Sequence, residues 1–410
     1  MIGSPPTLQE DALGALTHLR ASFGKLFASI GVPVDRAHQI QTGLGLDKKL
    51  AWRIHGFLSD EDVLAGSRHL PSSLGLDIVL KAAREHGAEA VLTEEVRAAF
   101  DAYEVVIKAH AGERTSMEMM LASLSDRVLT DTTRSHLREA FKANSYIWGA
   151  QAKVRLSTFI CHPSITDQGR VDIAAVYGLH ELRRIRPGIS WPFVHRRCVD
   201  DDGKIRLPLN LTPIDEQPPR DDGLPPVPLL REFCSQPVPE VRRYHGAENH
   251  LVDELVETRI GNQGVVDCFG GEVASGVGVR YQNEHNTVAE MVVRMRTTTK
   301  WLLSDVFLHK DLVPEVTPAL GVYADIEGMP MAAPAQRNKL PHVGELKTLG
   351  ASAKAPYTPL IPRYADMIEY VTSKLGWDIG DFMVYRVQLE YPVIPSSVSI
   401  SWPLPLHPDS

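Results

Sequence analysis

The spacing of apolar residues along the chain changes near residue 157. Before that point, apolar side chains recur every three or four residues, which is typical of amphipathic helices. After it they alternate with polar residues and are interrupted by proline and glycine, which indicates strands joined by loops. We therefore predict an α+β protein with an all-helical domain at residues 1–157 and a β-rich domain at residues 158–410.

The helical domain is expected to begin with a long helix at residues 8–30, which Gly31 ends. Further helices are predicted around residues 40 and 54, after the acidic run 60–62, and at 76–83 and 93–107. Thr115 and Glu118 have the spacing of a capping box, in which each side chain satisfies a backbone amide of the first turn. Asp131 is expected to cap the last long helix.

In the β-rich domain, three segments show the period-two pattern of a strand with one face on a core, namely residues 291–296, 384–391 and 398–402. One amphipathic helix is predicted at about residues 364–375, so this domain is expected to be sandwich-like or a helix on a sheet. Residues 174–184 are interpreted as one more helix, and the glycine-rich residues 261–278 as tight hairpins. The proline-rich residues 207–240 predict a long surface loop or a linker.

Residues 37–57 fit the pattern of a helix-turn-helix, in which two short helices pack closely around a tight turn. Gly45 lies at the expected turn, and Asp47 lies where the second helix needs an N-cap. The apolar positions of the pattern are filled by Ile40, Leu44, Leu46, Ala51 and Ile54. The segment resembles, over about 20 residues, the motif shared by many bacterial regulators. One departure is Gln41, where that motif usually has alanine.

Four polar residues of the second helix are the candidate DNA-binding residues: Lys48, Lys49, Arg53 and His55. Lysine and arginine at such positions contact phosphates, and Arg53 would reach a guanine edge. The acidic run 60–62 would repel phosphate, and the same pattern also occurs in plain helical hairpins. Contact with duplex DNA and simple packing therefore remain two interpretations of this segment.

No sequence motif points to catalysis or to a metal. The chain has no GxSxG elbow, no GxxxxGK[ST] loop and no HExxH. The four cysteines form no CxxC pair, and we expect them to be buried free thiols. Asp305 and His309 are expected to share a strand face as a His–Asp pair, without an identified nucleophile. We predict no catalytic residue, no metal site and no cofactor.

The net charge of −8 argues against a protein coated in nucleic acid, although it leaves room for a local basic face. With no targeting signal and no span of roughly 18 apolar residues, we expect a cytoplasmic protein that does not enter membranes. We predict a DNA-binding transcriptional regulator whose second domain binds a small ligand, forms a homo-oligomer, or both. A structural or assembly protein and an enzyme with a site built from loops are the alternatives.

Overall fold

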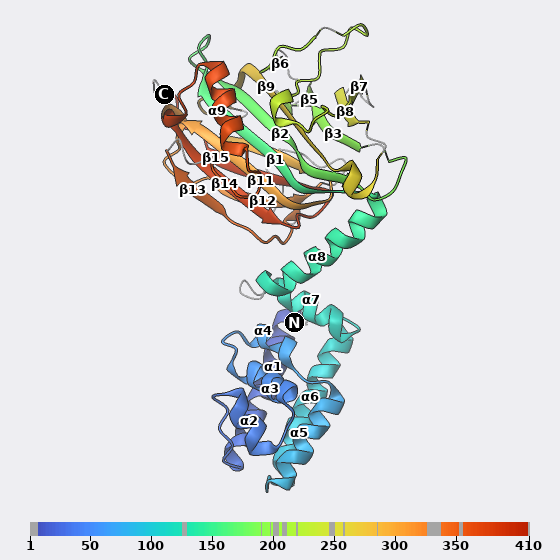
Figure 1. The fold of residues 1–410 in the computed structure, drawn as a ribbon. Coiled ribbons are helices and arrows are strands. Elements are labelled where there is room, and N and C mark those ends of the chain that lie inside the picture. The colour runs from blue at the N-terminus through green and yellow to red at the C-terminus, as the bar shows by residue number, and fades with distance from the viewer. Residues whose placement is uncertain are drawn as a thin grey trace. The chain divides into compact units, whose positions relative to one another are not determined.

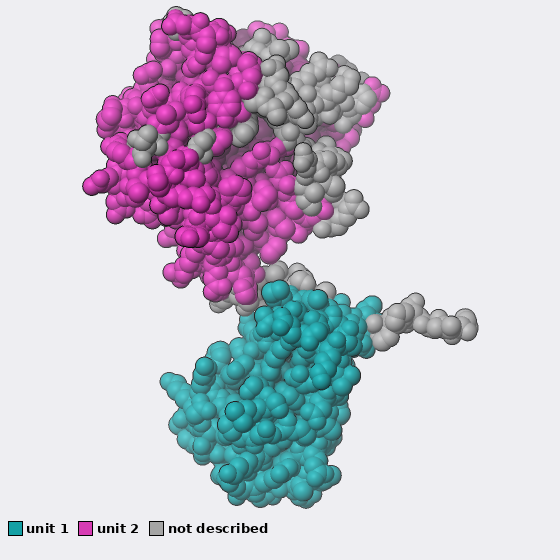
Figure 2. Space-filling view, turned by 90° about the vertical axis from the view of Figure 1, so that its right-hand side faces the viewer, with its two compact units in different colours: residues 1–132 teal, residues 133–410 magenta. Residues whose placement is uncertain are grey.

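The computed structural model describes residues 7–124, 129–189, 191–196, 198–199, 205–206, 211–218, 220–245, 251–256, 259–284, 286–325, 338–351 and 356–408. The chain forms two compact units, residues 1–132 and residues 133–410 (Figure 2). Helices come first and strands follow, so the predicted α+β class is confirmed. In the parts of the chain described here, no helix has the length and apolar character needed to cross a bilayer.

Unit 1 is a bundle of helices around one apolar core (Figure 1). Its helices are α1 (Leu8–Ser29), α2 (Ala37–Leu44), α3 (Lys48–Ser59), α4 (Val63–Gly66), α5 (Ser73–Glu85), α6 (Ala90–His110) and α7 (Arg114–Leu124), with the 3-10 turn η1 (Ser67–His69) after α4. Phe23 of α1 stacks on Phe27 and meets the ring of Phe57 edge-on. These contacts bury the apolar stripe of the first predicted helix, as its spacing indicates.

Two predicted helix caps differ from the structure. Helix α7 begins at Arg114, so Thr115 lies inside its first turn and not at the N-cap. Glu118 accepts a hydrogen bond from Arg114 Nε at 3.2 Å instead of forming the capping box. Helix α8 (Leu129–Trp148) begins before Asp131, which is therefore not its cap. In both cases the helix begins one or two residues before the polar residue that is typical of a cap.

Unit 2 contains all the strands of the described chain, the greater part of α8 and the helix α9 (Tyr364–Leu375). Its strands are β1 (Ala150–Pro163), β2 (Arg170–Arg184), β3 (Trp191–Arg196), β4 (Cys198–Val199), β5 (Ile205–Arg206), β6 (Leu211–Pro213), β7 (Val241–His245), β8 (Leu251–Leu255), β9 (Val266–Val279), β10 (Val288–Met295), β11 (Thr299–His309), β12 (Ala319–Ala324), β13 (Leu346–Gly350), β14 (Phe382–Glu390) and β15 (Ser396–Pro403). Short 3-10 turns are η2 (Arg231–Phe233), η4 (Gly261–Gly264), η5 (Lys310–Leu312) and η7 (Ile379–Asp381).

The main sheet has seven strands in the order β13-β14-β11-β1-β2-β9-β6. Strands β1 and β11 pair in parallel, whereas the other neighbouring pairs are antiparallel. A second sheet has three strands in the order β10-β15-β12. Two smaller sheets, β3-β8-β7 and β4-β5, complete the unit. The main sheet is therefore the scaffold that the other elements cover.

Alternate side chains of β1 show which layer covers each face of the main sheet. Val154, Leu156 and Ile160 pack in one core with α9. Cys161 packs in another core with residues of the three-stranded sheet, such as Val398. Helix α9 thus lies on one face and the three-stranded sheet on the other, and both predicted architectures, helix-on-sheet and sandwich, are present.

The predictions of a helix at residues 174–184 and of tight hairpins at residues 261–278 are wrong, because these segments contribute to the long strands β2 and β9. Residues 174–184 belong to β2, a central strand buried on both faces, so apolar residues do not alternate with polar ones there. Residues 266–279 form β9, whose glycines permit close packing instead of hairpin turns. A Cβ at Gly270 would meet the Tyr177 ring at 2.8 Å.

The predicted domain boundary at residue 157 lies inside β1, and the compact units divide at residue 132. The later part of α8 belongs to unit 2, because Leu137 and Phe141 pack against Tyr391. The described part of the proline-rich segment 207–240 joins β6 to β7 within unit 2, which makes it a loop and not a linker between units. Residues 207–210 lie outside the described chain.

A buried ion pair holds the middle of the main sheet. Asp305 of β11 lies directly opposite Arg386 of β14, and their side chains are 0% and 7% exposed. Arg386 donates to both carboxylate oxygens, from Nε to Asp305 Oδ1 at 2.9 Å and from Nη2 to Oδ2 at 2.6 Å. Tyr364 of α9 donates from its hydroxyl to the same carboxylate at 2.8 Å. The pair therefore connects two strands to the covering helix.

We expect Arg386→Met to lower the free energy of unfolding by about 3–5 kcal/mol, because it leaves the Asp305 carboxylate buried without its guanidinium. The double variant Asp305→Leu/Arg386→Met should regain most of that loss. Lys310→Met, which breaks the exposed pair with Asp381 at 2.8 Å, is the control and should cost less than about 1 kcal/mol. Urea denaturation measures all three. Equal losses in the single and double buried variants would contradict the prediction.

Candidate functional site

The helix-turn-helix segment of unit 1 has the local geometry that its pattern predicts. Helices α2 and α3 are joined at Gly45, whose φ of 64° is the left-handed conformation that glycine adopts without strain. The Asp47 carboxylate caps α3 by accepting from the backbone amides of Lys49 at 2.9 Å and Leu50 at 3.0 Å. The side chain of Ile54 is fully buried in the core.

The four candidate DNA-binding residues have two different environments. Lys48 and Lys49 are exposed in the first turn of α3. Arg53 is half-buried and donates from Nη2 to the carbonyl of Leu70 at 2.8 Å. His55 Nε2 lies 3.1 Å from the carbonyl of Asp35. The two lysines are therefore available to a partner, whereas Arg53 and His55 hold neighbouring segments of the same unit.

Sequence reasoning missed the largest exposed side chain of α3. Trp52 is 56% exposed, and it lies one turn after Lys48 on the same side of the helix. Its indole meets His69 edge-on, with the ring centroids 5.0 Å apart. The signal that could have identified Trp52 is a large apolar residue at a position where the helix-turn-helix pattern places a polar one. Lys48, Lys49 and Trp52 together form what we call the α3 surface.

The acidic run 60–62, next to α3, has structural roles that reduce its electrostatic repulsion of phosphate. Asp62 caps α4 by accepting from the amides of Leu64 and Ala65, at 2.9 and 3.3 Å. The Asp60 carboxylate lies 3.7 Å from the guanidinium of Arg68. The charges of Asp60 and Asp62 are thus engaged within unit 1.

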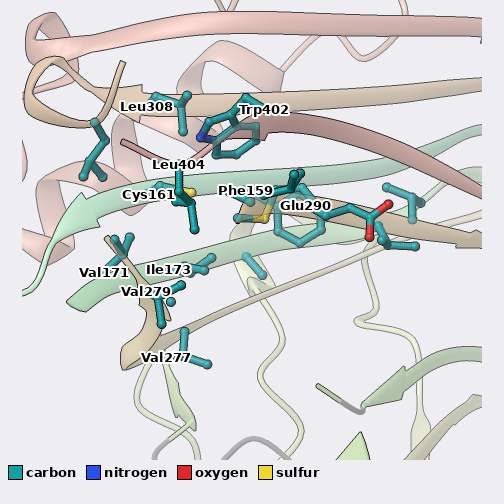
Figure 3. A pocket seen from close by; sticks show the side chains of 18 of the residues that line it. Phe159, Cys161, Val171, Ile173, Val277, Val279, Glu290, Leu308, Trp402 and Leu404 are labelled. Atoms are coloured by element: carbon teal, nitrogen blue, oxygen red, sulfur yellow. The ribbon is translucent and has the colours of Figure 1, made fainter. Parts of the chain in front are cut away.

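A second candidate site is a cavity of about 1230 Å³ in unit 2. It lies between the face of the main sheet opposite α9 and the three-stranded sheet, with η5 and the segment after β15 also lining it. Figure 3 shows Trp402 and Leu404 directed toward the same space as Phe159 and Ile173. A cavity of this size can enclose a drug-sized molecule.

One part of the cavity wall is polar. Arg155 of β1, Tyr177 of β2 and Glu272 of β9 lie in a diagonal across three adjacent strands of the main sheet. The Tyr177 hydroxyl donates to Glu272 Oε1 at 3.2 Å. Burial lowers the pKa of Arg155 to about 10, and the interaction with Tyr177 opposes that shift. This part of the wall therefore holds a partly buried positive charge.

The expected pair of Asp305 and His309 does not form. Asp305 is bonded to Arg386 and to Tyr364, on the α9 side of the sheet. The His309 ring packs against that of His162 with centroids 4.7 Å apart, and its Nδ1 accepts from the amide of Asp311. Neither residue of the expected pair lines the cavity. The strand periodicity places them on one face, but their partners come from β14, α9 and β1.

Three of the cysteines are buried and free, as predicted; the side chain of Cys198 lies outside the description. Cys161 lines the cavity, and burial raises its pKa to about 12, which makes it a poor nucleophile. In the part of the chain that is described, no group of three histidine, cysteine or acidic residues is arranged to hold a metal ion.

Comparison of the chain with known protein families, with curated proteins and with solved structures finds no match. The α3 surface and the cavity are therefore the features from which a function can be inferred.

The two environments of the candidate residues predict different effects on stability. Arg53→Ala should lower the free energy of unfolding of unit 1 by about 1–3 kcal/mol, because it removes a charged donor from the Leu70 carbonyl. Lys48→Ala and Lys49→Ala should stay within about 0.5 kcal/mol of the parent protein, since both side chains are exposed. Denaturation followed by the helical circular-dichroism signal measures this. A neutral Arg53→Ala would show that the contact carries no stability.

We expect the protein to lose stability in acid because of the environment of His309. Its side chain is 10% exposed, and burial, followed by the charge of His162, lowers its pKa from 6.5. The unfolded chain then binds the proton more readily, so the contribution is complete above pH 6.5 and is lost as the pH falls below it. His309→Gln should reduce the loss of melting temperature between about pH 7 and pH 5. An unchanged pH dependence would assign the loss to other groups.

Proposed function

We propose that the protein is a DNA-binding regulator, which contacts duplex DNA through the α3 surface and holds a small ligand in the cavity of unit 2. The observation that carries the proposal is the exposure of Lys48 and Lys49 at the start of α3, directly after the turn at Gly45. In helix-turn-helix proteins it is this end of the second helix that enters the major groove.

Each part of the α3 surface has a role in this proposal. Lys48 and Lys49 neutralise phosphates and set the position of the helix on the duplex. Trp52 offers an apolar surface of the kind that contacts a thymine methyl group. Arg53, which we first expected to read a guanine edge, instead supports the α3 surface through its bond to the Leu70 carbonyl. One short helix reads few base pairs, so we expect two copies to bind two half-sites.

The first test is fluorescence anisotropy of the full chain with a mixed-sequence duplex, between about 50 and 200 mM salt. Lys48→Ala/Lys49→Ala should weaken binding at low salt and reduce the salt slope by about two, because each lysine that contacts a phosphate contributes about one. The matched control is Lys81→Ala/Lys108→Ala, which removes the same charge from exposed positions of α5 and α6. The control should bind like the parent protein.

No binding at low salt, or equal binding by the two double variants, would contradict the DNA contact. The size of the protein in solution is the companion measurement. A dimer agrees with two half-sites, whereas a large closed or open assembly favours the structural protein that the sequence left open.

A further inference from the structure

The cavity of unit 2 is lined by apolar side chains over much of its wall. They come from adjacent strands of the main sheet and from the chain around β15, and include Phe159, Cys161, Val171, Ile173, Trp402 and Leu404 (Figure 3). An apolar wall of this kind favours hydrocarbon or aromatic groups, because it removes them from water without offering hydrogen bonds. This part of the cavity suits the body of a ligand and not its charged group.

The polar part of the wall contains the Arg155 guanidinium. Ser157 and Phe159 follow it on the same face of β1, two and four residues later. Side chains at 155, 157, 159 and 161 point to the same face of β1, so the wall changes from charged to apolar along one strand. Arginine presents a planar set of donors that matches a carboxylate in a bidentate arrangement. A ligand carboxylate at this end of the cavity would meet that set of donors while the rest of the ligand lies against the apolar wall.

The same wall limits the charge that the ligand can carry. Glu272 lies next to Tyr177 on the polar diagonal, and Glu290 of β10 lines the cavity with its carboxylate bonded to Ser399. Among the described lining residues, arginine and acidic side chains are equal in number. A ligand with several negative charges, such as a nucleotide, would face as many carboxylates as guanidinium groups, which costs it affinity.

We propose that the cavity of unit 2 binds an amphipathic monoanion, with a single carboxylate at Arg155 and an apolar body against Phe159, Ile173 and Trp402. The inference deepens the ligand part of the proposed function. It is independent of the DNA contact, because ligand binding and DNA binding are measured in separate titrations of the same full chain.

Decanoate and decanol form the matched probe pair, since they share the chain and differ in the charged group. Both are titrated as competitors of bound dansylaminoundecanoic acid, whose emission reports an apolar environment. Decanoate should displace the probe at a concentration at least about tenfold lower than decanol, because a charge-assisted contact is worth more than the desolvation it requires here. Ile173→Trp, which fills the apolar end, should weaken both competitors and the probe.

Arg155→Gln should bring the ratio of the displacing concentrations of decanol and decanoate to near one, while leaving decanol binding unchanged. Retained decanol binding shows that this variant is folded. Arg183→Gln makes the same change at an exposed position of β2 that does not line the cavity, and it should keep the full preference.

The proposal is overturned if the parent protein binds neither competitor, if it binds both equally, or if Arg155→Gln keeps the preference. It is also overturned if Ile173→Trp, folded by circular dichroism, binds the probe as the parent protein does. If Arg155→Gln fails to fold, two results still test the proposal. They are the ratio of the displacing concentrations of decanol and decanoate in the parent protein, and the effect of Ile173→Trp on probe binding.

Discussion

The buried pair of Asp305 and Arg386 is the constraint on which unit 2 depends. A carboxylate and a guanidinium can occupy the middle of a sheet only if each satisfies the other, and here they lie in direct register on β11 and β14. A shift of either strand by one residue would separate them. Since Tyr364 of α9 is bonded to the same carboxylate, the pair also fixes which face of the sheet α9 covers, and so leaves the opposite face for the second sheet and the cavity.

Sequence patterns predicted the elements whose two faces differ in polarity. Helix α9 and the strands β10, β14 and β15 have one buried face and one more polar face, and each was recognised from its period. Strand β2 is buried on both faces, so its period was lost and it was interpreted as a helix. Periodicity also could not show that β14 and β15, joined by a short turn, lie in different sheets. That assignment depends on pairing with strands far away in sequence.

The same limit applies to the two candidate sites. The hairpin of α2 and α3 is local, so Gly45 and Asp47 identified it, and the exposed Lys48 and Lys49 followed from the helix period. The bond of Arg53 to Leu70 depends on how η1 packs, which no local pattern contains. The cavity is less predictable still. Arg155 is one arginine in an apolar strand, and its relation to Tyr177 and Glu272 exists only after β1, β2 and β9 have paired.

The order of the second sheet has a kinetic consequence. In the described chain, β10 and β12 pair with β15 and with no other strand, so β15 is the central strand although it is the last in sequence. Neither of its neighbours gains a partner strand until residues 396–403 have been synthesised and have returned to them. Main-sheet strands β1 and β2 can pair long before that. The cavity therefore acquires its second wall late in folding, and until then the newly made chain exposes Phe159 and Ile173 to solvent and to chaperones.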